Sequence, residues 1–294
     1  MENNTPVTET SELEFLKEGS QVLLLRHANS KYNFAYETMT SKGYTEEDEK
    51  KLRVKKDLRD SPLSDLGIQQ CIKAQPLANK LKVDHVFVSP LKRALETAYY
   101  VFMNHPNFDN IQFILMPILK EAIDTTCDIP VNVQETVEEF KGKFPKFDTS
   151  ELEKYSDPLH FFLEDINLDF SKKILSSKIL DSNDPLCSNA YDLLLDEINE
   201  NYPAQIETRK SAITRVNKAK KVVKDFLEST ELDSDSKVVL VGHSNYFKMW
   251  TGKWDRDISS YGDQLPEPSD SVFLRNCQFL PDNSDFPRSS TTCI

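Results

Sequence analysis

The chain has no long apolar stretch and no surplus of positive charge. No segment approaches the roughly 20 consecutive apolar residues that a membrane helix needs. The first 20 residues hold more acidic than basic side chains and no apolar core, so we expect neither a signal peptide nor a transit peptide. The formal net charge of −12 argues against a general nucleic-acid binder, because such proteins neutralise phosphates with Lys and Arg.

Cysteine and glycine are also scarce. The five cysteines form no Cys-x-x-Cys pair, so we expect no zinc site, and an odd number of thiols without a signal peptide indicates reduced cysteines in the cytoplasm. The seven glycines form no Gly-rich Walker loop, which argues against a fused kinase of the P-loop type. With 38% hydrophobic residues among 294, the chain is long and apolar enough for a globular protein with a sizeable core.

Predicted strands alternate with predicted helices along most of the chain. Helical spacing of apolar residues follows Ser64, begins again at Pro90 and returns from about 206 to 228, and Pro90 suits the first turn of a helix. Apolar or β-branched segments bounded by turn residues predict strands at 21–25, 85–88, 112–116, 238–241 and 272–279. The alternation predicts a three-layer α/β/α fold with a doubly wound, mainly parallel sheet.

We expect a single domain over residues 1–294, with its core at about 20–121 and 206–280. Residues 122–205 contain five prolines and one glycine among many charged and aromatic side chains. That composition predicts a largely helical insertion, which we expect over the ligand-binding edge of the sheet. Residues 36–58 form a shorter charged excursion, and residues 281–294 are predicted to be a disordered tail.

Four separate segments carry groups that suit phosphate chemistry. Arg26-His27 and His243 each follow an apolar run that predicts a buried strand. Ligands of open α/β sheets bind outside the carboxyl ends of the strands, so these histidines are expected to converge. Arg93 is expected in the first turn of a helix, where free backbone N–H groups favour an anion. Glu121 follows the third predicted strand.

These residue types match the needs of phosphoryl transfer. Its transition state spreads negative charge over three oxygens, and the guanidinium forks of Arg26 and Arg93 are suited to bind it. A neutral imidazole is a good nucleophile toward phosphorus, so one of the two histidines is the candidate nucleophile and the other a clamp. Protonation of the leaving alcohol requires an acid, for which Glu121 is the candidate and Asp124 the alternative.

The three remaining histidines lack such partners. They are His85, His105 and His160. Single histidines without a surrounding constellation carry little functional information, and we expect these three to be ordinary core or surface residues.

With these motifs in view, the sequence resembles the histidine phosphatase superfamily, branch 1, which has the phosphoglycerate-mutase-like fold. The resemblance rests on LLLRHANSKYN at 23–33, DSPLSDLGIQQ at 60–70, VFVSPLKRALETA at 86–98 and VVLVGHSNYFK at 238–248. It implies a reaction through a phosphohistidine, without a metal or other cofactor. The residue roles that it implies are nucleophile for His27, phosphoryl binding for Arg26, Arg93 and His243, proton donation for Glu121, and phosphate contacts for Ser30 and Asn33.

Two positions depart from the family pattern. Ala28 replaces the usual glycine after the first histidine, and Ser244 replaces the glycine common after the second. A Cβ disfavours the left-handed backbone region, so Ala28 is compatible with the site only where its φ is negative.

The function expected from the resemblance is hydrolysis of a phosphomonoester, on a small phosphorylated metabolite or a phosphoprotein. A phosphoglycerate mutase-type phosphotransferase is the alternative, but residues 122–205 contain no Arg-Arg pair or Arg-Tyr-Tyr-Gly stretch of the kind those mutases show. A second alternative is an inactive pseudo-phosphatase that binds a phosphate or a protein. We expect no nucleic-acid or membrane partner, and neither substrate nor oligomeric state follows from the sequence.

Overall fold

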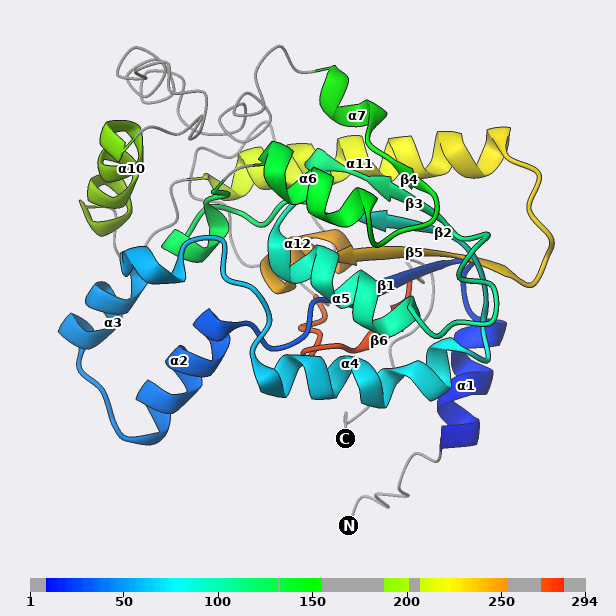
Figure 1. The fold of residues 1–294 in the computed structure, drawn as a ribbon, viewed down its shortest axis with the longest axis horizontal. Coiled ribbons are helices and arrows are strands. Elements are labelled where there is room, and N and C mark those ends of the chain that lie inside the picture. The colour runs from blue at the N-terminus through cyan, green and yellow to red at the C-terminus, as the bar shows by residue number, and fades with distance from the viewer. Residues whose placement is uncertain (1–8, 132, 155–187, 201–206, 253–270, 283–294) are drawn as a thin grey trace.

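A computed structural model describes residues 9–131, 133–154, 188–200, 207–252 and 271–282, and its centre is a six-stranded sheet (Figure 1). The strand order is β4-β3-β2-β5-β1-β6. Only β6 runs antiparallel to its neighbour, β1; the other pairs are parallel. The mainly parallel sheet is therefore confirmed. The strands are β1 (Val22–Arg26), β2 (Lys82–Val88), β3 (Gln112–Leu115), β4 (Phe147–Asp148), β5 (Ser236–Gly242) and β6 (Phe279–Pro281).

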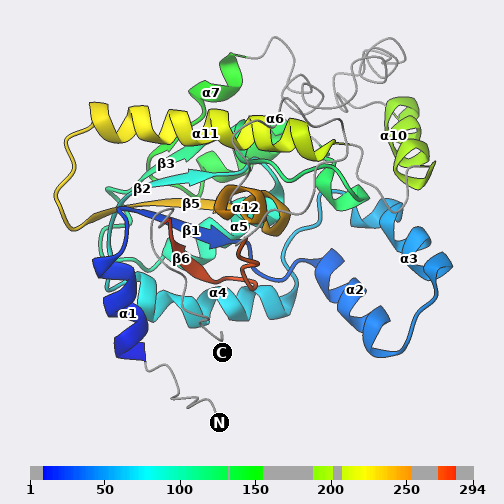
Figure 2. The same cartoon turned by 180° about the vertical axis from the view of Figure 1, so that it is seen from behind.

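Helices cover both faces of this sheet (Figures 1 and 2). On one face lie α1 (Glu9–Glu18), α4 (Asp65–Ala78) and α5 (Lys92–Phe102), and on the other lie α11 (Arg209–Ser229) and α12 (Ser244–Thr251). Successive strand residues point to opposite faces: Leu23 and Leu25 join the α4–α5 cluster, whereas Leu24 joins the α11–α12 cluster. The three-layer α/β/α arrangement is confirmed.

The remaining elements gather mainly at one end of the sheet and along its β4 edge. The charged excursion after β1 forms α2 (Lys31–Ser41), α3 (Glu46–Arg53) and η1 (Lys56–Leu58), which lie with α10 (Ser188–Glu200) at the end where β1 stops (Figures 1 and 2). The other short elements are η2 (Pro117–Leu119), η3 (Thr126–Asp128), α6 (Val133–Lys141) and α7 (Ser150–Glu153).

The proposed domain boundaries stay a prediction. Within residues 122–205 the described part is mostly helical, with β4 adding a short strand at the sheet edge. Segments 155–187 and 201–205 lie outside the described residues, as do His160 and residues 283–294 of the expected tail. Pro281, at the start of that tail, pairs with Leu23 of β1.

Two details of the sequence prediction are wrong. The expected strand at 272–279 begins only at Phe279. Before it the backbone turns, with Cys277 at a φ of 57° and its N–H donated to the Arg26 carbonyl, so this segment packs around the end of β1 instead of extending along it. Helix α5 begins at Lys92 with Leu91 as its N-cap, which leaves Pro90 just outside the first turn.

The start of α4 is packed tightly against the segment that follows β1. Ser64 is the N-cap and accepts a hydrogen bond from the Gly67 N–H, as its residue type favours. The Ser64 hydroxyl also lies 2.6 Å from Asn29 Oδ1. A Cβ on Gly67 would lie 2.0 Å from the Asn29 carbonyl oxygen. Glycine is therefore required where α4 approaches this backbone.

Candidate active site

The two motif histidines meet at the carboxyl ends of neighbouring parallel strands. Arg26 of β1 is in register with Gly242 of β5, so the residues after them, His27 and His243, emerge at the same edge. Their ring centroids are 5.2 Å apart. The strand order, with β5 next to β1, thus brings together two segments from opposite ends of the chain.

The five side chains at the centre of the candidate site are all buried, with exposed fractions of 9% or less. They are Arg26, His27, Arg93, Glu121 and His243. Burial removes competing water, so hydrogen bonds and charges among these groups are stronger than at the surface.

His27 is held in one orientation and one tautomer. Its Nδ1 lies 2.7 Å from the Ala28 carbonyl oxygen, which only accepts hydrogen bonds, so Nδ1 carries the proton. Its Nε2 accepts a hydrogen bond of 3.2 Å from Arg93 Nε. Burial, followed by the charges of Arg93 and Arg26, holds the pKa of His27 well below its usual value. The imidazole is therefore neutral at pH 7, with its lone pair on Nε2.

Arg93 connects His27 to the segment after β3. It occupies the first turn of α5 and uses Nε for His27, Nη1 for the Cys127 carbonyl and Nη2 for Asp128 Oδ1 at 2.7 Å. These contacts employ three of the five N–H groups of a guanidinium. Two donors of Arg93 are thus left for a further acceptor.

Arg26 reaches the same centre from the end of β1. Its Nη1 donates to the Leu274 carbonyl at 2.8 Å, and its guanidinium lies 5.0 Å from the centre of the Phe273 ring. Its Nε is buried and has no hydrogen-bond partner among the described residues. Burial lowers the pKa of Arg26 to about 10, which leaves it cationic at pH 7.

His243 presents a second buried donor position. Its Nε2 lies 2.7 Å from Ser89 Oγ at the end of β2, while its Nδ1 is buried without a partner in the described part of the chain. Ser89 Oγ accepts from the Leu91 N–H, which favours donation of its own hydrogen to His243 Nε2. Sequence reasoning gave Ser89 no role, although it opens the motif that contains Arg93.

Glu121 is fastened to the helix that follows His243. Its Oε1 accepts hydrogen bonds from the N–H groups of Ala122 and Tyr246, and its Oε2 accepts one from Asn245. Burial is the largest cause that raises the pKa of Glu121, followed by the negative charge of Asp128; Arg93 and the backbone donors oppose them, and the result is about 7. A carboxyl with this pKa exchanges its proton readily near neutral pH.

Comparison with known proteins indicates one family. Residues 22–157 match the family described as histidine phosphatase superfamily (branch 1). The match covers just under half of the chain, and Arg26, His27, Arg93 and Glu121 lie within it.

Two curated relatives match shorter segments of the chain. A Schizosaccharomyces pombe (strain 972) protein named probable phosphatase is 29% identical over 124 residues, 41% of this chain and 55% of that protein. The fructose-2,6-bisphosphatase TIGAR B of Danio rerio is 40% identical over 62 residues, 21% of this chain and 24% of that protein. The chain thus spans about half the length of one of these relatives and about a quarter of the other.

Solved structures with low similarity were also found. Mycobacterial glucosyl-3-phosphoglycerate phosphatase in complex with VO3 has 13% identity and a TM-score of 0.42, with 88% of each chain covered. The ecdysone phosphate phosphatase of Bombix mori in complex with tungstate has 12% identity and a TM-score of 0.41, covering 93% of this chain and 96% of that one.

The family-derived phosphate contacts at Ser30 and Asn33 occupy the N-terminus of α2. Ser30 Oγ accepts from the Asn33 N–H, and Asn33 Oδ1 accepts from both the N–H and the hydroxyl of Ser30. Together they form a reciprocal capping box. A phosphate contact by the Ser30 hydroxyl would compete with this cap.

Asp124, the alternative acid, has a different environment. Its Oδ1 pairs with Arg53 of α3 at 2.5 Å. Burial raises the pKa of Asp124 to about 6, while Arg53 opposes the rise. Asp124 therefore faces α3, whereas Glu121 contacts the helix that begins beside His243.

The two departures from the family pattern are accommodated. Among the described residues, positive φ occurs at Gly43, Asp60 and Cys277 and not at Ala28. The Ala28 N–H donates to Thr97 Oγ1 at 3.0 Å. Ser244 is the first residue of α12. Neither side chain meets the steric penalty that a left-handed backbone would impose.

A buried ionic network that the sequence analysis missed supports the loop carrying Glu121. Glu207 forms a two-pronged ion pair with Arg215 at 3.0 and 2.8 Å and lies 3.5 Å from the Lys120 ammonium. Arg215 also donates to the carbonyls of Ile118 and Lys120. The network therefore fixes the backbone immediately before Glu121.

The other expected residues and sites lie elsewhere. His85 packs edge-on against Phe226, and His105 bonds the Leu81 carbonyl and the Asn107 N–H, so both have structural contacts. In the described ranges, no three His, Cys, Asp or Glu side chains are arranged to hold a metal ion. None of the helices described there has the length and apolarity to cross a membrane.

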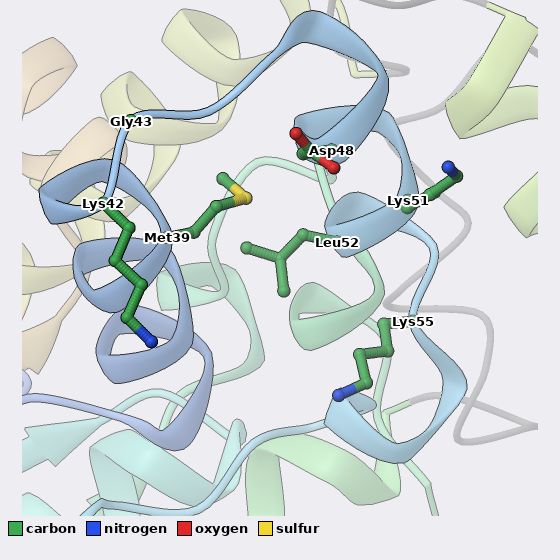
Figure 3. A pocket seen from close by; sticks show the side chains of 7 residues that line it. All are labelled: Met39, Lys42, Gly43, Asp48, Lys51, Leu52 and Lys55. Atoms are coloured by element: carbon green, nitrogen blue, oxygen red, sulfur yellow. The ribbon is translucent and has the colours of Figure 1, made fainter.

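A separate hollow of about 590 Å³ lies between α2 and α3 (Figure 3). None of the candidate catalytic side chains contributes to it. The lining residues are Met39, Lys42, Gly43, Asp48, Lys51, Leu52 and Lys55. The hollow contains neither a histidine nor an arginine, so it lacks the residue types of the candidate active site.

Proposed function

We propose that the protein is a phosphomonoester hydrolase in which His27 Nε2 carries the phosphoryl group as a phosphohistidine. The observation that carries this proposal is the set of buried donors on the side chains around His27. Arg26 Nε and His243 Nδ1 are buried without partners among the described residues, and Arg93 already contacts Nε2. Buried donors are normally satisfied, so these groups indicate an anionic ligand, and a phosphoryl group has the three oxygens to accept from them.

The reaction follows from the properties of these groups. A phosphoryl oxygen takes over Arg93 Nε from His27, which releases the Nε2 lone pair for attack on phosphorus. The P–N bond forms, the P–O bond to the alcohol breaks, and Glu121 gives its proton to the leaving oxygen. Water then attacks the phosphohistidine while Glu121 takes its proton, and the P–N electrons return to Nε2.

The substrate proposed is a small phosphorylated metabolite or a phosphoprotein. Two relatives whose names include phosphatase or bisphosphatase support hydrolysis over transfer to a second acceptor.

Purified protein assayed on a panel of aryl and alkyl phosphates and phosphopeptides should release inorganic phosphate. Acid quenching should be avoided, because phosphohistidine is acid-labile; base-stable label on His27, found by mass spectrometry, would support the intermediate. A protein inactive on the whole panel would instead be a pseudo-phosphatase.

The assignment of the acid predicts a dependence on the leaving group. Glu121→Gln should slow phosphoenzyme formation from an alkyl phosphate by about 1,000-fold, a typical acid–base contribution. Nitrophenyl phosphate needs little protonation, so its first-turnover burst should persist while later hydrolysis slows. Stopped-flow measurement of nitrophenol release separates the two phases.

Asp124→Asn is the matched control for that experiment. It removes the alternative acid while keeping its size, and phosphoenzyme formation from the alkyl phosphate should fall less than about 10-fold. A large, leaving-group-dependent loss with Asp124→Asn and none with Glu121→Gln would exchange their roles.

A further inference from the structure

The segment after Glu121 folds back against the arginine that contacts the candidate nucleophile. Asp128 Oδ1 accepts from Arg93 Nη2 at 2.7 Å, and both side chains of this ion pair are 5% exposed or less. Its other oxygen, Oδ2, accepts from the N–H groups of Asp124 and Thr125 and from the Thr125 hydroxyl. The Asp128 carboxylate is thus fixed by the two residues that precede its own short helix η3, and it fixes Arg93 in turn.

The contact determines which way Arg93 points. A guanidinium is planar, so holding Nη2 on Asp128 and Nη1 on the Cys127 carbonyl sets the direction of Nε. Nε lies 3.2 Å from His27 Nε2. Without Asp128 the Arg93 guanidinium loses one of its two fixed contacts. Its Nε then no longer points at His27 Nε2, the nitrogen that is to be phosphorylated.

The same carboxylate also acts on Glu121. The charged groups facing Glu121 are Asp128 from η3, Arg93 from α5 and Arg26 from the end of β1, together with the backbone donors of α12. Only Asp128 among these charges is negative. It disfavours the ionised form of Glu121, whereas the two arginines favour it.

We propose, on the basis of the phosphatase function above, that Asp128 is a positioning residue for the reaction: it aims Arg93 at His27 from a place where its negative charge also faces Glu121. Both effects come from the Asp128 carboxylate. Asp128 lies outside the sequence motifs that contain the two histidines, so these motifs do not predict its role. The groups facing Asp128 itself are Arg93, Tyr32 of α2, Asp124, Glu121 and the Cys127 thiol.

The test measures the rate of phosphoenzyme formation from an alkyl phosphate as a function of pH. In the wild type the rate should fall above about pH 7, because Glu121 with its raised pKa then loses the proton that it donates. Asp128→Asn removes the negative charge, so the pKa of Glu121 falls and the high-pH limb should move down by about one pH unit. The rate at the optimum should also fall about 100-fold through loss of alignment.

Two control variants separate charge from general loosening. Thr125→Val removes the hydroxyl bond to Asp128 Oδ2, which is 3.2 Å long, but keeps the charge, so the limb should stay in place. Asp128→Glu keeps the charge at a shifted position, and it should lose rate while retaining the limb. The proposal is overturned if the high-pH limb of the pH–rate profile of Asp128→Asn coincides with that of the wild type. It is also overturned if Asp128→Glu shifts this limb as far as Asp128→Asn does.

Infrared titration supplies a readout that needs neither turnover nor a folded Asp128 variant. The protonated carboxyl band lost in Glu121→Gln should persist in the wild type up to about pH 7. Its disappearance near the ordinary range of a glutamic acid would overturn the part of the proposal that concerns Glu121. Failure of the wild type to hydrolyse any phosphate, with the band still titrating near neutrality, would instead contradict the proposed function.

Discussion

Replacing His27 by asparagine should lower turnover by at least about 1,000-fold and remove the phosphoenzyme label, because loss of a nucleophile eliminates the covalent route. The Asn amide N–H can still donate toward the Ala28 carbonyl, as His27 Nδ1 does at 2.7 Å. What it lacks is a basic nitrogen at the position of Nε2. Steady-state assays and mass spectrometry after brief exposure to substrate measure the two effects.

His243→Asn is the informative comparison. His243 offers Nδ1 to the site and is held by Ser89 at the other ring nitrogen, so its loss should slow the reaction while label still accumulates on His27. Circular dichroism and thermal unfolding should show both variants folded. Label that survives His27→Asn and is lost in His243→Asn would reverse the two roles.

Gly67→Ala should lower the free energy of unfolding by about 3 kcal/mol, at the upper end of overpacking effects. The new Cβ would lie 2.0 Å from the Asn29 carbonyl oxygen and 2.9 Å from its carbon. Both are backbone atoms, so no side-chain rotation relieves the clash. Because Asn29 follows His27 by two residues, the shift should also reduce turnover. Urea denaturation followed by circular dichroism gives the change in stability.

Gly142→Ala provides the matched substitution. Its Cβ would meet only the Glu139 carbonyl, at an ordinary 3.6 Å. Its φ is not positive, since among described glycines only Gly43 has that conformation. The free energy of unfolding should therefore stay within about 1 kcal/mol of the wild type. Equal losses in the two alanine variants would show that close packing at Asn29 is not the cause.

The strands of the sheet could be predicted where an apolar run is bounded by turn residues and the strand has a neighbour on both sides in the sheet. The runs at β1 and β5 are fully buried parallel strands, those at β2 and β3 are partly buried ones, and their sequences identify all four without their partners. The segment 272–279 has similar composition but turns around Arg26, because the Leu274 carbonyl binds the guanidinium and the Cys277 N–H binds the Arg26 carbonyl. Such tertiary contacts cannot be recognised in the local sequence of the segment.

The sequence by itself indicated the candidate reactive groups and the family resemblance, because the identities of Arg26, His27, Arg93 and His243 and their places at or near the ends of predicted strands are local properties. Only the tertiary structure decided which nitrogen of His27 keeps the lone pair, since the Ala28 carbonyl takes the proton of the other. It likewise separated Glu121 from Asp124 and brought Asp128 to Arg93. Protonation and orientation depend on burial and on partners from distant segments, and these exist only once the chain has folded.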